Sequence, residues 1–351
     1  MANMAQAIRL ALHYGEKNLG VTDIFGEDVG APLGGVFTCT QGLKTTWNTP
    51  LDERGIVGHA IGLALAGQKP VAEIQFCDYI FNTIDLLKLA GNSCWSSNGQ
   101  YPLDMVLMTP HGAGIHGSIY HSHSFDAWAT RLPGWKIVIP SNPLDAYGLM
   151  LAALEDPNPV MYLAPKALLR SKGKEKIPGE PDEAELKKAI DAPIGDRQNW
   201  EPQWPAIQRH LQPLGKAKQV RQGNSATIVT YGRHVQMSQQ VADELSSKGM
   251  GEVRVIDLCT LYPYDWEAIS KAVLETGKIL FVNEDTEITN FGEHLLRRVI
   301  DEHYYQLKAR PRVLAAQHVP GVGLAPTLEE ATVPQKKDIE KAITEILQER
   351  T

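Results

Sequence analysis

The chain has 351 residues, of which 43% are hydrophobic and 21% charged, a composition typical of a folded protein with two ordinary domains. A net charge of −7 and a pI near 5.9 give no reason to expect a nucleic acid as a partner. No apolar run is long enough to span a membrane. Residues 1–18 predict an amphipathic helix and lack the apolar core and cleavage site of a signal peptide, so we expect a cytoplasmic protein.

In the first half of the chain, short β-rich apolar runs alternate with helical patterns. This alternation predicts a parallel sheet covered by helices. The predicted strands cover residues 21–29, 71–76, 105–109, 135–140 and 160–164, and the predicted helices cover residues 54–67, 79–93 and 142–155.

Residues 171–211 interrupt this pattern with charge clusters, several prolines and the segment NWEPQWP, in which Trp200 and Trp204 are expected to dock on a surface. A second alternating block follows. Its predicted strands cover 225–232, 252–258, 278–284 and the RVLAA segment, and its predicted helices cover 234–248, 265–276, 292–306 and 336–349. We therefore predict an α/β domain at 1–170, a linker with an insertion at 171–211 and a second α/β domain at 212–351.

The segment GAGIHG (112–117) follows a predicted strand and matches the GxGxxG pattern of dinucleotide-binding folds. However, the polar sequence SIYHSHS follows it instead of an apolar helix, which favours a flexible loop that approaches a ligand. His121 and His123 lie in this polar stretch without the spacing of a metal site. Two interpretations stay open: one histidine transfers protons, or the stretch is a polar surface loop.

The stretch NTPLDERGIVGHAIGLALAG (48–67) places Asp52 and Glu53 before a helix of small apolar residues, which predicts a buried helix. The two acids either cap this helix or include one that transfers protons in a dry pocket.

GEDVG (26–30) and EIQFCDYIFNT (73–83) end predicted strands, where open α/β sheets bind ligands. Tyr79 and Phe81 either stack on a planar ring or belong to the core. The sequence has no GxxxxGK[ST] phosphate loop, no GxSxG elbow and no GDG followed by Asn.

The motifs GEDVG, GGVF, NTPLDERGIVGHAIG, PVAEIQFCDYIF, YHSHS, PSNPLDAYGL, DPNPV and PLGKA occur in this order. Together they resemble the β subunit of thiamine-diphosphate-dependent 2-oxo acid dehydrogenases, over nearly the whole chain apart from 171–211. The resemblance implies a pyrimidine-binding domain and a transketolase C-terminal-like domain. It implies oxidative decarboxylation of pyruvate or a branched-chain 2-oxo acid, with acyl transfer to the lipoyl groups of an acyltransferase component.

By this resemblance, Glu53 bonds a ring nitrogen of the thiamine pyrimidine and promotes proton removal from the thiazolium carbon, and His121 transfers protons. The resemblance implies that the residues that line the cofactor are Glu27, Leu51, Asp52, Glu53, Gln75, Tyr79, Phe81 and Asn82. It implies a monovalent cation, usually K⁺, at Ala153, Leu154, Asp156 and Asn158. Mg²⁺ is expected on an α subunit, which completes a heterotetramer that also contains a β–β contact.

The sequence departs from the family pattern between Leu43 and Asn48, at CWSSNGQY (94–101), at His123 and at HVPGVGLAP. These differences leave the substrate open. Two alternative functions also stay open. One is a self-sufficient thiamine enzyme of the transketolase or deoxyxylulose-phosphate synthase kind, and the other is a non-catalytic scaffold subunit. The missing GDG motif disfavours the first, and the presence of Glu53, Tyr79 and His121 disfavours the second.

Overall fold

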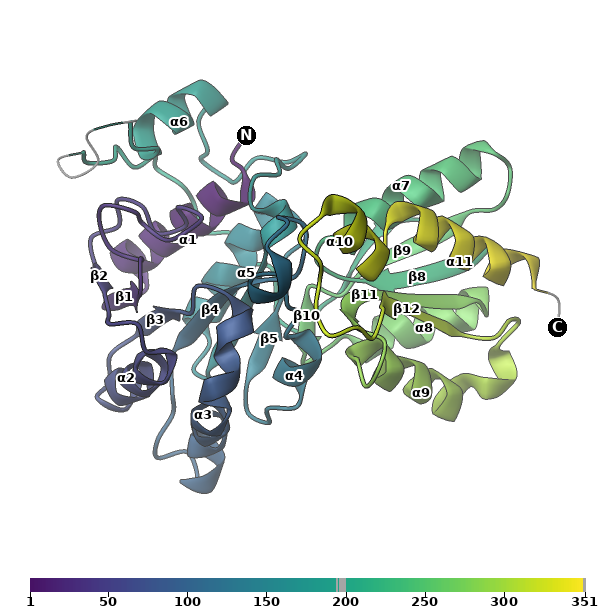
Figure 1. Ribbon diagram of the computed structural model, residues 1–351, viewed down its shortest axis with the longest axis horizontal. Coiled ribbons are helices and arrows are strands. Elements are labelled where there is room, and N and C mark those ends of the chain that lie inside the picture. The colour runs from purple at the N-terminus through teal and green to yellow at the C-terminus, as the bar shows by residue number, and fades with distance from the viewer. Residues whose placement is uncertain (194, 196–199, 350–351) are drawn as a thin grey trace. The chain divides into compact units, whose positions relative to one another are not determined.

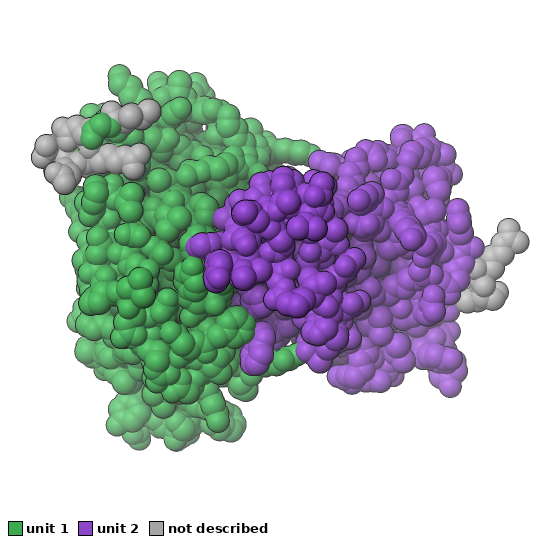
Figure 2. All heavy atoms as spheres, in the orientation of Figure 1, with its two compact units in different colours: residues 1–111, 131–214 green, residues 112–130, 215–351 purple. Residues whose placement is uncertain are grey.

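The computed structural model describes residues 1–193, 195 and 200–349. The chain divides into unit 1, residues 1–111 and 131–214, and unit 2, residues 112–130 and 215–351 (Figure 2). Each unit contains its own sheet with helices on both faces, which confirms the predicted α/β class with two parallel-sheet domains. Residues 112–130, which the sequence analysis assigned to the first domain, belong to unit 2.

The sheet of unit 1 consists of parallel strands whose spatial order is β5-β6-β4-β3-β1-β2. Both faces of such a sheet are covered, so its strands are continuous apolar runs, and β4 and β6 are buried along their whole length. The strands are β1 (Asp23–Gly26), β2 (Thr46–Asn48), β3 (Pro70–Glu73), β4 (Val106–His111), β5 (Lys136–Val138) and β6 (Val160–Pro165).

Helices cover the two faces of this sheet according to the direction of the strand crossovers. The right-handed connections from β1 to β3 and from β3 to β4 place α2 and α3 on one face (Figure 1). The connection from β5 back to β6 runs the other way and places α5 on the opposite face, where it packs against α1. The helices of unit 1 are α1 (Met4–Asn18), α2 (Glu53–Leu65), η1 (Cys77–Thr83), α3 (Ile84–Ser96), α5 (Pro143–Glu155), η3 (Lys166–Leu168) and α6 (Glu183–Ile190).

Helix α1 is buried almost all round, from Met4 to Leu12, whereas the sequence predicts an amphipathic helix. The described part of the 171–211 insertion explains the difference, because it contacts the polar residues of α1. The Arg9 guanidinium lies 3.0 Å from the Asp191 carboxylate, and the Trp204 ring stacks on His13 at 4.2 Å between centroids. The insertion therefore supplies partners for polar side chains that would otherwise need solvent.

The sheet of unit 2 has the order β12-β11-β8-β9-β7, in which β7 is antiparallel to β9 and the other neighbouring strands are parallel. Its strands are β7 (Lys218–Arg221), β8 (Ala226–Thr230), β9 (Val253–Asp257), β11 (Ile279–Thr286) and β12 (Arg312–Ala316), and the short strand β10 (Thr260–Tyr262) follows β9. The helices of unit 2 are η2 (Ser118–Tyr120), α4 (Asp126–Thr130), α7 (His234–Ser247), α8 (Trp266–Thr276), α9 (Phe291–His303), η4 (Tyr304–Gln306), α10 (Pro326–Thr332) and α11 (Lys336–Gln348).

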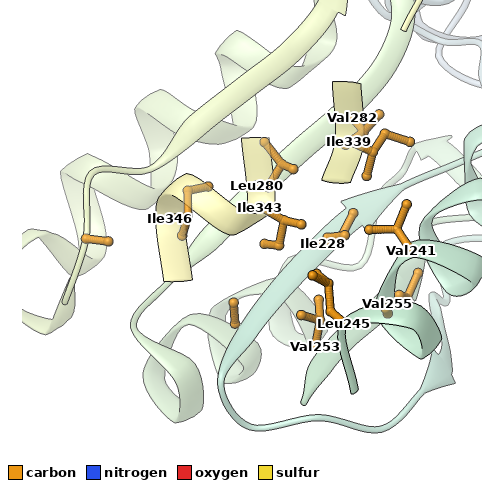
Figure 3. Packing of buried hydrophobic residues seen from close by; sticks show 13 residues of the cluster. Ile228, Val241, Leu245, Val253, Val255, Leu280, Val282, Ile339, Ile343 and Ile346 are labelled. Carbon is orange, nitrogen blue, oxygen red and sulfur yellow. The ribbon is translucent and has the colours of Figure 1, made fainter. Parts of the chain in front are cut away.

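The core of unit 2 lies between its sheet and the helices α7 and α11 (Figure 3). Ile339, Ile343 and Ile346 of α11 recur at the spacing of one helix face, and all three are fully buried against strand residues such as Ile228 and Leu280. Burying each of these side chains stabilises the fold by roughly 1.5–3 kcal/mol relative to leaving it exposed. In the described part of the chain, no helix combines the length and low polarity needed to cross a bilayer.

Candidate active site

The carboxyl ends of β1 and β3 bring polar side chains to one edge of the unit 1 sheet. Glu27 and Asp28 follow β1, and Gln75 follows β3. The Gln75 side-chain amide donates a hydrogen bond to the Asp28 carboxylate, and the Asp28 carbonyl accepts a bond of 2.7 Å from the Gly35 N–H. The edge where an open parallel sheet binds ligands therefore carries two of the predicted cofactor residues, Glu27 and Gln75.

Helix α2 begins at the same edge with the pair of acids that the sequence singled out. Asp52 is the N-cap residue, but its side chain makes no capping hydrogen bond, so the structure does not support the capping interpretation for this side chain. Glu53 is half-buried, and its Oε2 accepts a hydrogen bond of 3.3 Å from the Asn82 side-chain amide. Leu51 is 80% exposed and Phe81 is 36% exposed.

Tyr79 lies on η1 and shares its surroundings with two of these acids. Burial raises the pKa of Tyr79, and the charges of Glu27 and Glu53 are among the further causes. Burial also raises the pKa of Glu27, with the charge of Glu53 as the next cause. Because charge interactions weaken with distance, these shifts indicate that the three side chains lie near one another at this edge. The structure thus brings together Glu27, Glu53, Tyr79 and Asn82, and their roles toward a cofactor stay predictions.

Only one face of helix α2 is buried, whereas the sequence predicts a buried helix. Gly55 and Gly62 lie on the exposed side, and a Cβ at Gly62 would meet no atom of the described chain within 4 Å. The apolar residues of the other face pack on unit 1; they are Ile56, Val57, Ala60, Ile61 and Ala64. The glycines of α2 thus leave a face of small residues, which also includes the exposed His59, open beside Glu53.

Glu73 is a buried carboxyl group at this edge that the sequence analysis did not single out. It ends β3 and is 4% exposed. Burial, together with the nearby Asp28, raises the pKa of Glu73 to about 8. The only sequence feature that indicates this residue is its position as an acid at the end of an apolar strand. Whether such an acid is buried depends on tertiary packing, which the sequence does not show.

The raised pKa of Glu73 predicts that stability depends on pH. Between pH 4.5 and about 8 the unfolded chain has lost the proton that the folded chain keeps, so stability falls as pH rises through this window. Glu73→Gln removes this dependence, because its side chain is neutral at every pH. We expect the variant to melt roughly 2–4 °C above the unaltered chain at pH 8. Thermal unfolding across the window tests this, with the exposed Glu175→Gln as the matched control; equal slopes for Glu73→Gln and the unaltered chain would contradict it.

The glycine loop 112–117 is held by carboxylates of its own unit. The Ala113 N–H donates to Glu284 Oε2 at 3.1 Å, and the His116 N–H donates to Glu329 Oε2 at 3.0 Å. Gly112 has a φ of 80°, and a Cβ there would lie 2.2 Å from the Glu284 carboxylate, so only glycine fits. The two N–H groups bind carboxylates, which disfavours the phosphate-binding interpretation of the GxGxxG match.

His121 belongs to unit 2 and is half-buried beside this loop. Its Nδ1 lies 3.3 Å from the Gly117 carbonyl oxygen, which can only accept a hydrogen bond. The proton of a neutral ring is therefore placed on Nδ1, which leaves the basic lone pair on Nε2. A Cβ at Gly117 would lie 2.6 Å from the His121 Cβ, so the glycine permits this close approach.

A buried polar network anchors α4, five residues after His121, to the sheet of unit 2. The Tyr231 hydroxyl donates to Asp126 at 2.6 Å, and the Ala127 N–H donates to Asp285 at 3.2 Å. Burial first, and then the charge of Asp285, raise the pKa of Asp126 well above its usual value. A raised pKa favours the protonated form of Asp126, and its side chain shares a hydrogen bond with that of Asp285. No local sequence pattern predicts this long-range network.

The residues predicted to bind a monovalent cation lie at the opposite edge of the unit 1 sheet, between the end of α5 and the start of β6. Lys69 and Lys136, which precede β3 and begin β5, reach the same place. The Lys69 ammonium lies 2.8 Å from the Leu154 carbonyl oxygen, and the Lys136 ammonium contacts the Asp156 carboxylate.

Comparisons with known protein families divide the chain much as the two sheets do. Residues 1–172 match the pyrimidine-binding domain of transketolase, and residues 215–339 match the transketolase C-terminal domain. A chain of the solved structure described as "Split gene transketolase, inactive beta4 tetramer" is similar over 100% of both chains, with a TM-score of 0.70. Its sequence identity is 18%, so this likeness shows the fold alone.

Curated relatives are similar over most of their length. The 2-oxoisovalerate dehydrogenase subunit beta of Bacillus subtilis is 34% identical, with 97% of each chain covered. The pyruvate dehydrogenase E1 component subunit beta of Acholeplasma laidlawii is 36% identical, with 87% of this chain and 85% of the relative covered. The matched domains and the coverage of these relatives agree with each other and with the motifs, and the chain therefore belongs to the family of β subunits of thiamine-diphosphate-dependent 2-oxo acid dehydrogenases.

Proposed function

We propose that this chain supplies one half of a thiamine diphosphate site in a 2-oxo acid dehydrogenase and is active only with an α subunit. The enzyme decarboxylates pyruvate or a branched-chain 2-oxo acid and transfers the acyl group to the lipoyl groups of an acyltransferase. The observation that carries the proposal is the grouping of Glu27, Glu53, Tyr79 and Asn82 at the ligand-binding edge of the unit 1 sheet.

These residues fit the pyrimidine half of the cofactor. Tyr79 offers a ring for stacking, and the half-buried Glu53 offers a carboxyl group that Asn82 orients. When bound, thiamine diphosphate supplies the nucleophilic carbon and accepts the electron pair released by decarboxylation. Glu53 holds a proton toward the pyrimidine ring, and His121 Nε2 accepts or returns a proton during acyl transfer.

The diphosphate and its Mg²⁺ are assigned to the α subunit. Neither a GDG motif followed by Asn nor a P-loop occurs in the sequence. The glycine face of α2 and Leu51, which is 80% exposed, lie beside Glu53. Small side chains let a partner approach closely, and an exposed leucine offers apolar area to it. We propose that the α subunit covers this surface. A β–β contact and an acyltransferase partner complete the proposed assembly.

Reconstitution with a separate α chain that carries the GDG motif tests the proposal. We expect decarboxylation only when both chains are present, and the relative rates with pyruvate and with branched-chain 2-oxo acids identify the substrate. Activity of the α chain alone, or no activity of the pair with any 2-oxo acid, would overturn the proposal. The self-sufficient alternative is not favoured, because relatives named as β subunits match the chain over up to 97% of its length.

His121→Ala is expected to lower single-turnover decarboxylation or acyl transfer by at least about a hundredfold, since it removes an acid–base group. Cofactor affinity should stay within a few-fold of that of the unaltered enzyme. His303→Ala on α9, where His303 bonds the Ser270 hydroxyl, is the matched control in the same unit. A variant that lost cofactor binding but kept its single-turnover rate would show that His121 has another role.

A further inference from the structure

The family resemblance implies a bound K⁺ where α5 ends and the chain leads into β6, but several oxygen atoms there already have protein partners. The Leu154 carbonyl accepts a hydrogen bond of 2.8 Å from the Lys69 ammonium. The Ala153 carbonyl lies 3.4 Å from the Asp156 N–H. Asp156 Oδ1 accepts bonds from the Asn158 N–H at 3.0 Å and from the Asn158 side-chain amide at 2.8 Å.

Two ammonium groups balance the charge of two carboxylates at this place. The Lys69 ammonium lies 2.9 Å from Asp104, and the Lys136 ammonium is paired with Asp156. The charge of Asp156 also acts on Asp104, so the two pairs form one cluster. The side chain of Asp156 is 11% exposed and that of Lys69 is 21% exposed, which weakens screening by solvent.

A monovalent cation does not fit this arrangement. It needs several oxygen ligands. Here the Leu154 carbonyl already binds an ammonium group, and the Asp156 carboxylate already accepts hydrogen bonds and pairs with a second ammonium group. A K⁺ ion would also add a third positive charge to a cluster in which two positive charges already match two negative ones. Like charges a few ångströms apart repel one another near a protein surface, which disfavours the ion.

We propose that the Lys69 and Lys136 ammonium groups take the place of a monovalent cation in this chain. A lysine ammonium carries the same charge as K⁺ and binds the same kind of oxygen atom. Because it is part of the chain, no ion has to be bound from solution. The two lysines therefore stabilise the loop that leads into β6 without a bound ion. This inference concerns the stability of unit 1 and does not depend on the reaction proposed above.

Thermal unfolding of the full chain in KCl, NaCl, CsCl and tetramethylammonium chloride at equal ionic strength tests the proposal. For the unaltered chain we expect melting temperatures that agree within about 1 °C among the salts, since an ion that does not bind the folded state cannot stabilise it. A rise specific to K⁺ that saturates with concentration would overturn the proposal.

The variant Lys69→Met removes one ammonium and leaves the Leu154 carbonyl and Asp104 unpaired. We expect a less stable chain that regains roughly 2–5 °C in melting temperature selectively with K⁺. Lys88→Met, at an exposed lysine of α3, is the matched control and should gain nothing. If Lys69→Met does not fold in any salt, the same melting experiment on Lys136→Met, which removes the other ammonium group, tests the proposal instead. A folded variant with no cation-selective gain would overturn the proposal, because the vacated place would then have no affinity for a cation.

Discussion

Glu53→Gln is expected to lower decarboxylation by the assembled enzyme at least about a hundredfold, with little change in fold. The amide of Gln keeps the size of the side chain and accepts the bond from Asn82, but it cannot act as a carboxylic acid toward the pyrimidine ring. The reduced rate should appear in a single turnover with saturating cofactor, which separates chemistry from cofactor affinity.

Glu267→Gln is the matched control for this experiment. Glu267 is an exposed glutamate in the first turn of α8, so the substitution repeats the loss of one negative charge at a helix start. We expect its turnover to equal that of the unaltered enzyme. Near-normal turnover of the Glu53→Gln enzyme, in the presence of the α chain, would remove Glu53 from the proposed mechanism.

The regular elements of the two sheets were predictable, because strands buried on both faces must be apolar along their length. The run VMYLA (160–164) predicted β6 (Val160–Pro165), and the predicted helix at 142–155 corresponds to α5 (Pro143–Glu155). Short elements such as β2 (Thr46–Asn48) and α4 (Asp126–Thr130) were missed. They are too short to show a period, and their positions depend on neighbours that are distant in the sequence.

Long-range polar contacts were the main features that the sequence could not supply. Arg9 and Asp191 pair across 182 positions, and Tyr231 bonds Asp126 across 105 positions. In neither pair does the sequence around one residue predict which distant residue will be its partner. The same limit applies to Lys69: a lysine before a strand is ordinary on a surface, and only the fold brings it to the Leu154 carbonyl.

The residues of the candidate site were predictable from the sequence, but their arrangement in space was not. The motifs identified Glu27, Glu53, Tyr79 and His121 as polar or aromatic residues after strands, at a helix start or in a loop. The structure adds that the first three lie near one another in unit 1, while His121 lies beside a glycine loop in unit 2. The electrostatic coupling of these side chains depends on distance and burial, which a sequence does not record.

The isolated chain is expected to bind thiamine diphosphate weakly and to decarboxylate no 2-oxo acid. The residues grouped in unit 1 suit a neutral ring, and the group itself is acidic. Most of the cofactor's charge lies on the diphosphate, which needs Mg²⁺ and polar ligands. A site that holds only the ring forgoes those interactions, and the carboxylates of Glu27 and Glu53 repel an anion that no cation neutralises.

Titration calorimetry of the purified chain with thiamine diphosphate and Mg²⁺, repeated after addition of the α chain, tests this split site most directly. The split site predicts weak or undetectable heat for the chain alone and tight binding, one cofactor for each α–β pair, once the α chain is present. Tight, stoichiometric binding to the isolated chain, accompanied by decarboxylation of a 2-oxo acid, would contradict the split site and favour a self-sufficient enzyme.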